Sequence, residues 1–171
     1  MADHLFHYLT YLGDGIIWVP FAIWVLVYRK KMWPLVISAI VFSTFLVQFS
    51  KQVIFTNEAR PTKSITEMAL IHTVEGVELH TNNSFPSGHN TTAFSIFLLL
   101  CLLLSARYFW IPGFLLAVLT GYSRIYLAQH FPLDAGAGMI AAVISVYASL
   151  WVQERIDARY NPASAEMNQI H

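Results

Sequence analysis

Long apolar segments are the feature that most constrains how this chain can fold. Five of them follow one another, at about residues 15–28, 33–55, 91–106, 108–127 and 135–152. A helix needs about 20 residues to cross the roughly 30 Å hydrocarbon core of a bilayer. Two of the segments reach that length, and polar flanks can extend the other three. Helices of a soluble bundle would show polar faces at helical spacing, which these segments lack.

Composition agrees with a chain that lies within a bilayer. Hydrophobic residues make up 56% of the sequence and charged residues only 12%, against about 25% charged residues in soluble domains. The sequence therefore predicts an all-α fold, a polytopic membrane helix bundle with about five transmembrane helices. The formal net charge is zero, so no basic field attracts nucleic acid and no such partner is expected. The sequence does not indicate an oligomeric state.

The ends of the chain differ from the apolar segments. Residues 3–12 carry apolar side chains at helical spacing but are too short to span a bilayer, so we expect a short amphipathic helix in the membrane interface. Residues 1–152 are expected to form one membrane-embedded domain that includes a long loop at 56–90. Residues 153–171 are polar and are expected to form a carboxyl-terminal tail that extends the last helix briefly.

Positive charges between the segments predict how the chain is oriented. If five segments span the bilayer, one side receives six of these charges, at Arg29, Lys30, Lys31, Arg107, Arg155 and Arg159. Positively charged loops stay on the cytoplasmic side of a membrane. The long loop at 56–90 is therefore expected on the opposite side.

Three polar clusters fall on that opposite side. The first is Lys51 with Arg60-Pro61, the second is Pro86-Ser87-Gly88-His89, and the third is Ser123-Arg124 followed by His130 and Asp134. Because successive segments alternate in direction, all three clusters reach the same face at one depth. Charged groups at membrane depth cost several kcal/mol unless they are paired, so they indicate a functional site.

The clustered cations suit phosphoryl transfer, in which catalysis is mostly positioning and charge stabilisation. Arg60 and Arg124 carry planar guanidinium groups that match phosphate oxygens, and Lys51 adds a point charge. Ser87 and Gly88 precede a segment expected to be helical, and the free N–H groups at a helix start favour an anion.

The remaining polar side chains suit covalent and acid–base steps. His130 and Asp134 are four residues apart, so they can meet on one helical turn. The carboxylate can then orient the imidazole and stabilise its cationic form. His89 can donate a proton to the leaving oxygen. Since no cluster of carboxylates suggests bound magnesium, we expect no metal and no other cofactor.

These clusters resemble the pattern of the type 2 phosphatidic acid phosphatase superfamily, K-x6-RP, then PSGH, then SR-x5-H-x3-D. The second and third parts match without change. The resemblance implies that His130 attacks phosphorus, that Asp134 supports it and that His89 protonates the leaving group. It also implies a set of phosphate-binding residues, namely Lys51, Arg60, Ser87, Gly88 and Arg124.

The resemblance further implies an integral membrane lipid phosphatase that is independent of metals and forms a phosphohistidine intermediate. Its substrate would be a lipid phosphate monoester or diphosphate of the undecaprenyl diphosphate, phosphatidylglycerol phosphate, phosphatidic acid or lipid A type. The small size fits a multi-pass protein of the bacterial cytoplasmic (inner) membrane, with its active site facing the periplasm or exterior. A lipid phosphotransferase and a non-catalytic phospholipid-binding membrane protein remain alternatives. Vanadate-dependent haloperoxidases share the pattern but are soluble and larger.

Two features depart from the family pattern. Eight residues, rather than six, separate Lys51 from Arg60, so either this loop has gained two residues or another lysine takes the role. Lys63 is the second candidate. Membrane members of the family commonly have six spanning helices, whereas five are expected here.

Overall fold

The computed structural model describes residues 1–67, 69, 71–104 and 108–160, and within these ranges every regular element is helical. The all-α prediction is therefore confirmed. In chain order the elements are α1 (Ala2–Leu9), η1 (Thr10–Gly13), η2 (Gly15–Ile17), α2 (Trp18–Tyr28), η3 (Lys30–Met32), α3 (Trp33–Phe49), the π turn η4 (Ser50–Ile54), α4 (Pro61–Ser64), α5 (Gly88–Leu104), α6 (Trp110–Tyr126) and α7 (Pro132–Tyr160).

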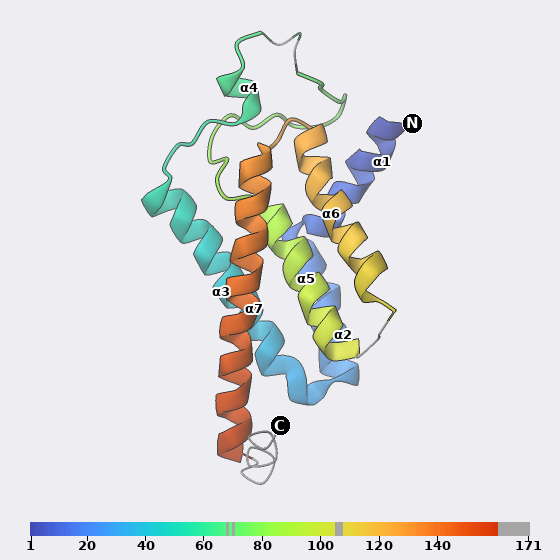
Figure 1. Ribbon diagram of the computed structural model, residues 1–171, viewed down its shortest axis with the longest axis vertical. Helices are drawn as coiled ribbons and strands as arrows, with labels where there is room; N and C mark the ends of the chain where they lie inside the picture. Colours follow the sequence, from blue (N-terminus) through green and yellow to red (C-terminus); the bar gives the residue numbers. More distant parts are fainter. Residues whose placement is uncertain (68, 70, 105–107, 161–171) are drawn as a thin grey trace.

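The long helix α7 organises the bundle. It packs along α3 and α5, and α5 in turn packs against α6 (Figure 1). Apolar side chains from α2, α3, α5 and α7 fill the space between these helices and exclude water from it. This core contains Trp18, Phe21, Val25, Leu35, Val36, Ala39, Leu99, Leu103 and Val146.

The outer faces of the helices are apolar as well. Large hydrophobic side chains that are more than 40% exposed cover α2, α3, α6 and α7; they include Val19, Ile23, Phe45, Leu115, Ile140 and Ile144. Soluble proteins rarely expose apolar surface on this scale, and such a surface marks contact with a partner or a membrane. An apolar exterior around an apolar core is what a helix bundle in lipid requires.

The structure has a helix at each of the five apolar segments, but the number of spans stays a prediction. By length and hydropathy, 30–54 and 132–160 can each cross a membrane. The pair formed by 2–13 and 15–28, bent by 54°, adds a third candidate if it counts as one span. Each of α5 and α6 has 17 residues, which is slightly short of a full crossing.

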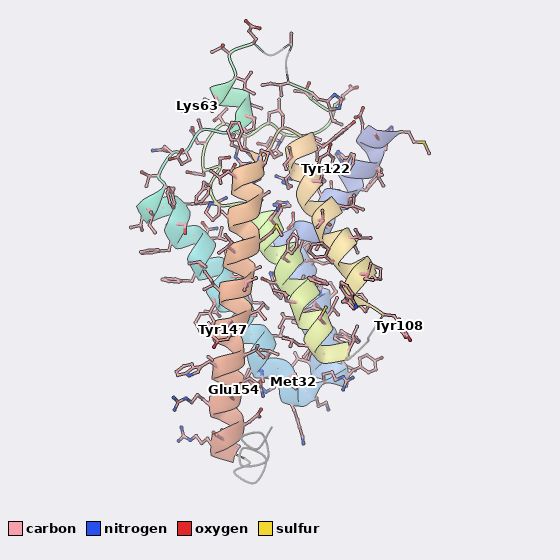
Figure 2. The ribbon with its side chains drawn as sticks, viewed as in Figure 1. Met32, Lys63, Tyr108, Tyr122, Tyr147 and Glu154 are labelled. Atoms are coloured by element: carbon pink, nitrogen blue, oxygen red, sulfur yellow. The ribbon has the colours of Figure 1, made fainter. Side chains whose placement is uncertain are left out.

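The two ends of the bundle carry different parts of the chain. The long loop crosses one end, where α1 also begins, and α7 ends at the other (Figure 1). Figure 2 shows Lys63 at the loop end and Met32 and Glu154 at the opposite end. The basic residues around Met32 and Glu154 therefore lie away from the loop, as the sequence predicts. Arg107 lies outside the described residues.

The loop contains a turn at Glu75 and Gly76, as the sequence HTVEGVELHT predicts, and Gly76 there has a φ of 84° that favours glycine. Other boundaries differ from the sequence expectations. The loop also contains the short helix α4. Helix α5 begins at Gly88 instead of about residue 91, because the Ser87 carbonyl already accepts from the Thr91 N–H (3.1 Å). Helix α7 continues through residues 153–160, which agrees with the expected brief extension into the tail, and residues 161–171 lie outside the described ranges.

A close contact between α5 and α7 fixes the loop end of the bundle. A Cβ on Gly138 would lie 2.5 Å from the Ser87 carbonyl oxygen and 2.8 Å from the Asn90 Cβ. Only glycine permits this approach. The Ser87 N–H donates to the Asp134 carbonyl (3.0 Å), and the Asn90 amide donates to the Ala135 carbonyl (3.2 Å). The beginnings of the two helices are therefore held side by side.

We expect Gly138→Ala to destabilise the protein by about 1–3 kcal/mol, because the added methyl group meets backbone that cannot move away. Gly136→Ala is the matched control, since a Cβ at Gly136 meets nothing within 4 Å. It should be neutral or stabilise α7 by up to about 1 kcal/mol. Unfolding of both variants in detergent would test this, and equal stability of the two would contradict the account of the contact.

Candidate active site

The structure gathers the predicted site residues at the loop end of the bundle. Lys51 lies in η4, Arg60 directly precedes α4, and Ser87 directly precedes α5, which begins with Gly88 and His89. The third cluster comes from the junction of α6 and α7, with Arg124 in the last turn of α6, His130 in the connection and Asp134 in the first turn of α7. Residues up to 83 positions apart in the chain, Lys51 and Asp134, thus meet at one place.

His130 and Asp134 form a buried pair. His130 is only 2% exposed, and its Nδ1 lies 3.4 Å from the Asp134 Oδ2. The same Oδ2 accepts a hydrogen bond from the Ser84 hydroxyl and another from the Phe131 N–H (2.9 Å). Within the described ranges, no group makes a hydrogen bond to Nδ1. Two other donors therefore hold the carboxylate in place beside the imidazole.

The surroundings of His130 keep its imidazole neutral. Burial, and to a smaller extent the charges of Arg60, Arg124 and Lys51, lower the pKa of His130. Asp134 acts against this shift, and the net pKa is about 4. At neutral pH the ring thus carries one proton. If that proton is on Nδ1, towards the carboxylate, the lone pair is on Nε2.

Arg60 is held mainly by backbone carbonyls. Its Nε donates to the Asn82 carbonyl (2.8 Å), and its Nη1 donates to the carbonyl (3.0 Å) and to Oε1 (3.1 Å) of Gln129. Burial lowers the pKa of Arg60, and Asp134 opposes this. These bonds tie the long loop to the connection between α6 and α7, so Arg60 has a structural role whatever it binds.

Arg124 is buried, and one of its N–H donors has no partner among the described residues. Its Nη1 donates to the Thr10 hydroxyl (2.8 Å), whereas its Nε has no hydrogen-bond partner in the part of the chain that the structure describes. A buried cation with an unpaired N–H donor lowers the stability of the folded state. The position suits an anionic ligand that can accept from it.

His89 and Arg124 face a common polar cavity of about 230 Å³. Its other walls come from the amino-terminal segment, the long loop and the α6–α7 connection, and they include Thr10, Asp14, Glu78 and Gln129. The cavity has room for a small polar group or several water molecules. The side chains of His89 and Arg124 can therefore both reach a group placed there.

Lys51, rather than Lys63, belongs to this cluster. The ammonium group of Lys51 contributes to the lowered pKa of His130. Lys63 is exposed and donates to the Asn82 Oδ1 (2.8 Å). Lys51 lies in the π turn, in which the Phe55 N–H donates to the Ser50 carbonyl (2.7 Å). Because a π turn adds a residue to a helix, this geometry lengthens the stretch between Lys51 and Arg60.

Three polar residues of the site are not indicated by the sequence. Ser84 orients Asp134, Gln129 binds Arg60, and Thr10 binds Arg124. Ser84 and Gln129 each adjoin a recognisable cluster, which is the one signal available. Thr10 has no such signal, because it lies in a segment expected only to rest in the interface.

The fold and the site define a class of protein, a bundle of apolar helices with a buried histidine–aspartate pair and three cations at one end. The sequence model of the PAP2 superfamily matches residues 32–157. The chain belongs to this superfamily.

Solved structures and a curated relative agree with this assignment. The crystal structure of Aquifex aeolicus LpxE is similar with a TM-score of 0.72 and 34% identity, covering 87% of this chain and 85% of that one. A PAP2-type phosphatidylglycerolphosphate phosphatase from Bacillus subtilis shares the fold, with a TM-score of 0.65 and 23% identity over 91% of this chain and 78% of that one. An undecaprenyl-diphosphatase of Sulfolobus acidocaldarius is 30% identical over 78% of this chain. The chain spans between 37% and 62% of the lengths of the curated relatives it matches.

The pKa of His130 makes a prediction about stability. The pKa of His130 is about 4 in the folded state and near 6.5 in the unfolded state. As the pH falls, the unfolded state therefore takes up the proton first. The free energy of unfolding should fall by about 3 kcal/mol between about pH 6.5 and pH 4. His130→Asn removes this titration. The difference in unfolding free energy between wild type and variant should therefore change across that range, and a constant difference would contradict the buried neutral imidazole.

The two lysines make a second prediction. If Lys51 stabilises charge on a bound phosphate, Lys51→Ala should lower kcat/KM for phosphate release about 10²-fold, the usual effect of removing one such group. Lys63→Ala should change it little, because Lys63 is exposed and bonded within the loop. Steady-state assays of both variants decide this. The reverse ranking would show that Lys63 is the family's lysine.

Proposed function

We propose that this protein is an integral membrane lipid phosphatase that hydrolyses a phosphate monoester or diphosphate of a lipid. The observation that carries the proposal is the buried, neutral His130 beside Asp134, surrounded by the charges of Lys51, Arg60 and Arg124. Membership of the PAP2 superfamily supports the reaction class. The names of two similar proteins suggest substrates, undecaprenyl diphosphate and phosphatidylglycerol phosphate. Phosphatidic acid and lipid A phosphates complete the substrate classes to be tested.

The proposed first step forms a phosphohistidine. The His130 Nε2 lone pair attacks phosphorus, and the bond from phosphorus to the lipid oxygen breaks. His89, which enters this step as an imidazolium favoured by the negative charge of the bound phosphate, gives a proton to that oxygen and becomes neutral. The lipid thus leaves as an alcohol or as a monophosphate. Asp134 stabilises the ring as it gains positive charge.

The second step returns the enzyme to its starting state. Water attacks the phosphohistidine, His89 takes up a proton from it, and inorganic phosphate leaves while His130 recovers its lone pair. In both steps, Arg124, Lys51 and the first N–H groups of α5 stabilise charge on the phosphoryl oxygens. Arg60 adds positive charge from its fixed position in the loop.

Three positively charged side chains can neutralise phosphate in the way that a metal ion does in other enzymes. We therefore propose that turnover needs no metal. Phosphate release should persist in a chelator, and loss of activity that magnesium restores would oppose this part of the proposal.

A lipid phosphotransferase would use the same phosphohistidine and differ only in the acceptor. Product analysis separates the two, because transfer yields a newly phosphorylated lipid in place of inorganic phosphate. A non-catalytic phospholipid-binding protein would yield neither product.

We also propose that the protein lies in a bacterial cytoplasmic (inner) membrane with the site facing the periplasm or exterior. The support is the charge at the opposite end of the bundle, where Lys30, Lys31 and Arg155 lie close to Met32 and Glu154 (Figure 2). An impermeant thiol reagent should label a cysteine introduced at Gly76 in intact cells and leave one at Ala158 unlabelled. The opposite labelling would reverse the orientation.

The direct test is a phosphate-release panel over the four lipid classes with purified protein. The wild type should release inorganic phosphate from at least one lipid. His130→Ala should release none while unfolding at a similar temperature, because it removes the group that is proposed to form the bond to phosphorus. Near-normal release by His130→Ala, or none from any lipid by the folded wild type, would refute the proposal.

A further inference from the structure

The amino-terminal segment contacts the site although the family match begins only at residue 32. The side chain of Thr10, in η1, accepts a 2.8 Å hydrogen bond from the Arg124 Nη1. Arg124 is 8% exposed, so this hydroxyl is a polar contact to a buried cation. A bond of this kind, to a charged group, is stronger than a bond between neutral groups.

Backbone packing also holds η1 against the site. A Cβ on Gly13 would lie 2.8 Å from the His89 carbonyl oxygen, 2.9 Å from the His89 Cβ and 3.1 Å from the Thr120 Cγ2. By contrast, a Cβ on Gly15 would meet nothing within 4 Å. The chain therefore approaches His89 closely at Gly13 and moves away from it two residues later.

The first turn of α1 provides a third connection. The Tyr126 hydroxyl donates to the Asp3 Oδ1 (2.6 Å), and the His72 Nε2 lies 2.9 Å from the same oxygen. The ring of Phe6 packs on the ring of Tyr126, with centroids 4.4 Å apart. Since Tyr126 is two residues from Arg124, these contacts hold α1 beside the end of α6 that carries the arginine.

We propose that η1 is part of the active site and that Thr10 is a positioning residue that orients Arg124 for the phosphate group. This inference rests on the proposed function, because it assigns a role in that same site. The Thr10 hydroxyl occupies one Nη1 donor and thereby fixes the plane of the guanidinium. The Nε of Arg124, which has no partner among the described residues, then keeps one direction and can donate to a phosphate oxygen. Thr10 itself does not touch the phosphate.

The test measures the binding of orthovanadate and of inorganic phosphate to the full chain in detergent by calorimetry. Thr10→Val keeps the shape of the side chain and removes the hydroxyl, and it should weaken both anions about tenfold, the size expected for a lost bond to a charged group. Thr10→Ser restores the hydroxyl and should bind within about threefold of wild type. A merely structural role would lower the unfolding temperature without this rescue pattern.

A second pair of variants tests the backbone contact. Gly13→Ala should weaken orthovanadate binding, because the methyl group pushes η1 away from His89 and carries Thr10 with it. Gly15→Ala is the matched control and should bind like wild type, since its methyl group enters open space.

The possible results separate this inference from the proposed function. Orthovanadate binding that is the same in wild type, Thr10→Val and Thr10→Ser overturns the inference, even if the wild type hydrolyses lipids. Weak binding by both Thr10→Val and Thr10→Ser also overturns it. If the binding order holds but no lipid is hydrolysed, the inference about Arg124 stands and the proposed reaction fails.

Discussion

The site depends on the contact between the first turns of α5 and α7. The Ser87 N–H donates to the Asp134 carbonyl, and Gly138 lets the two helices approach until the Ser87 carbonyl would meet any added Cβ. This contact joins two sequence clusters that lie more than 40 residues apart. It places the start of α5 beside Asp134, the partner of His130. A larger side chain at Gly138 would separate these two clusters.

Burial of two positive charges, on Arg60 and Arg124, is the main energetic cost of this arrangement, since each charged group in low dielectric needs a partner. The long loop and the α6–α7 connection provide carbonyl groups for Arg60, and η1 provides a hydroxyl for Arg124. These partners bear no negative charge, so they satisfy hydrogen bonds without neutralising the site. Under the proposed function, a bound phosphate group would supply the missing negative charge. The free energy spent on burying the cations would then favour substrate binding.

Much of the fold and part of the site follow from the sequence, because they depend on local pattern. Apolar length predicts where the helices form, and the spacing of His130 and Asp134 predicts their pairing. The brief helical extension of α7 into residues 153–160 follows from the sequence, but the role of Gln153 within it does not. Its buried amide accepts from the Leu35 N–H and donates to the Lys31 carbonyl, in a distant segment. The sequence does not predict the π turn or the roles of Ser84 and Thr10 either, since these roles arise only when distant segments meet. Residue roles at the site remain predictions.

The central claim is that His130 becomes covalently phosphorylated, and trapping that intermediate tests it most directly. In a His89→Ala variant, a lipid diphosphate with a good leaving group should phosphorylate the protein faster than water removes the phosphate. Rapid acid-free quenching and mass spectrometry should then place an acid-labile phosphate on His130. Phosphate on another residue, or an acid-stable phosphoester, would contradict the account, as would lipid turnover in a variant that lacks His130.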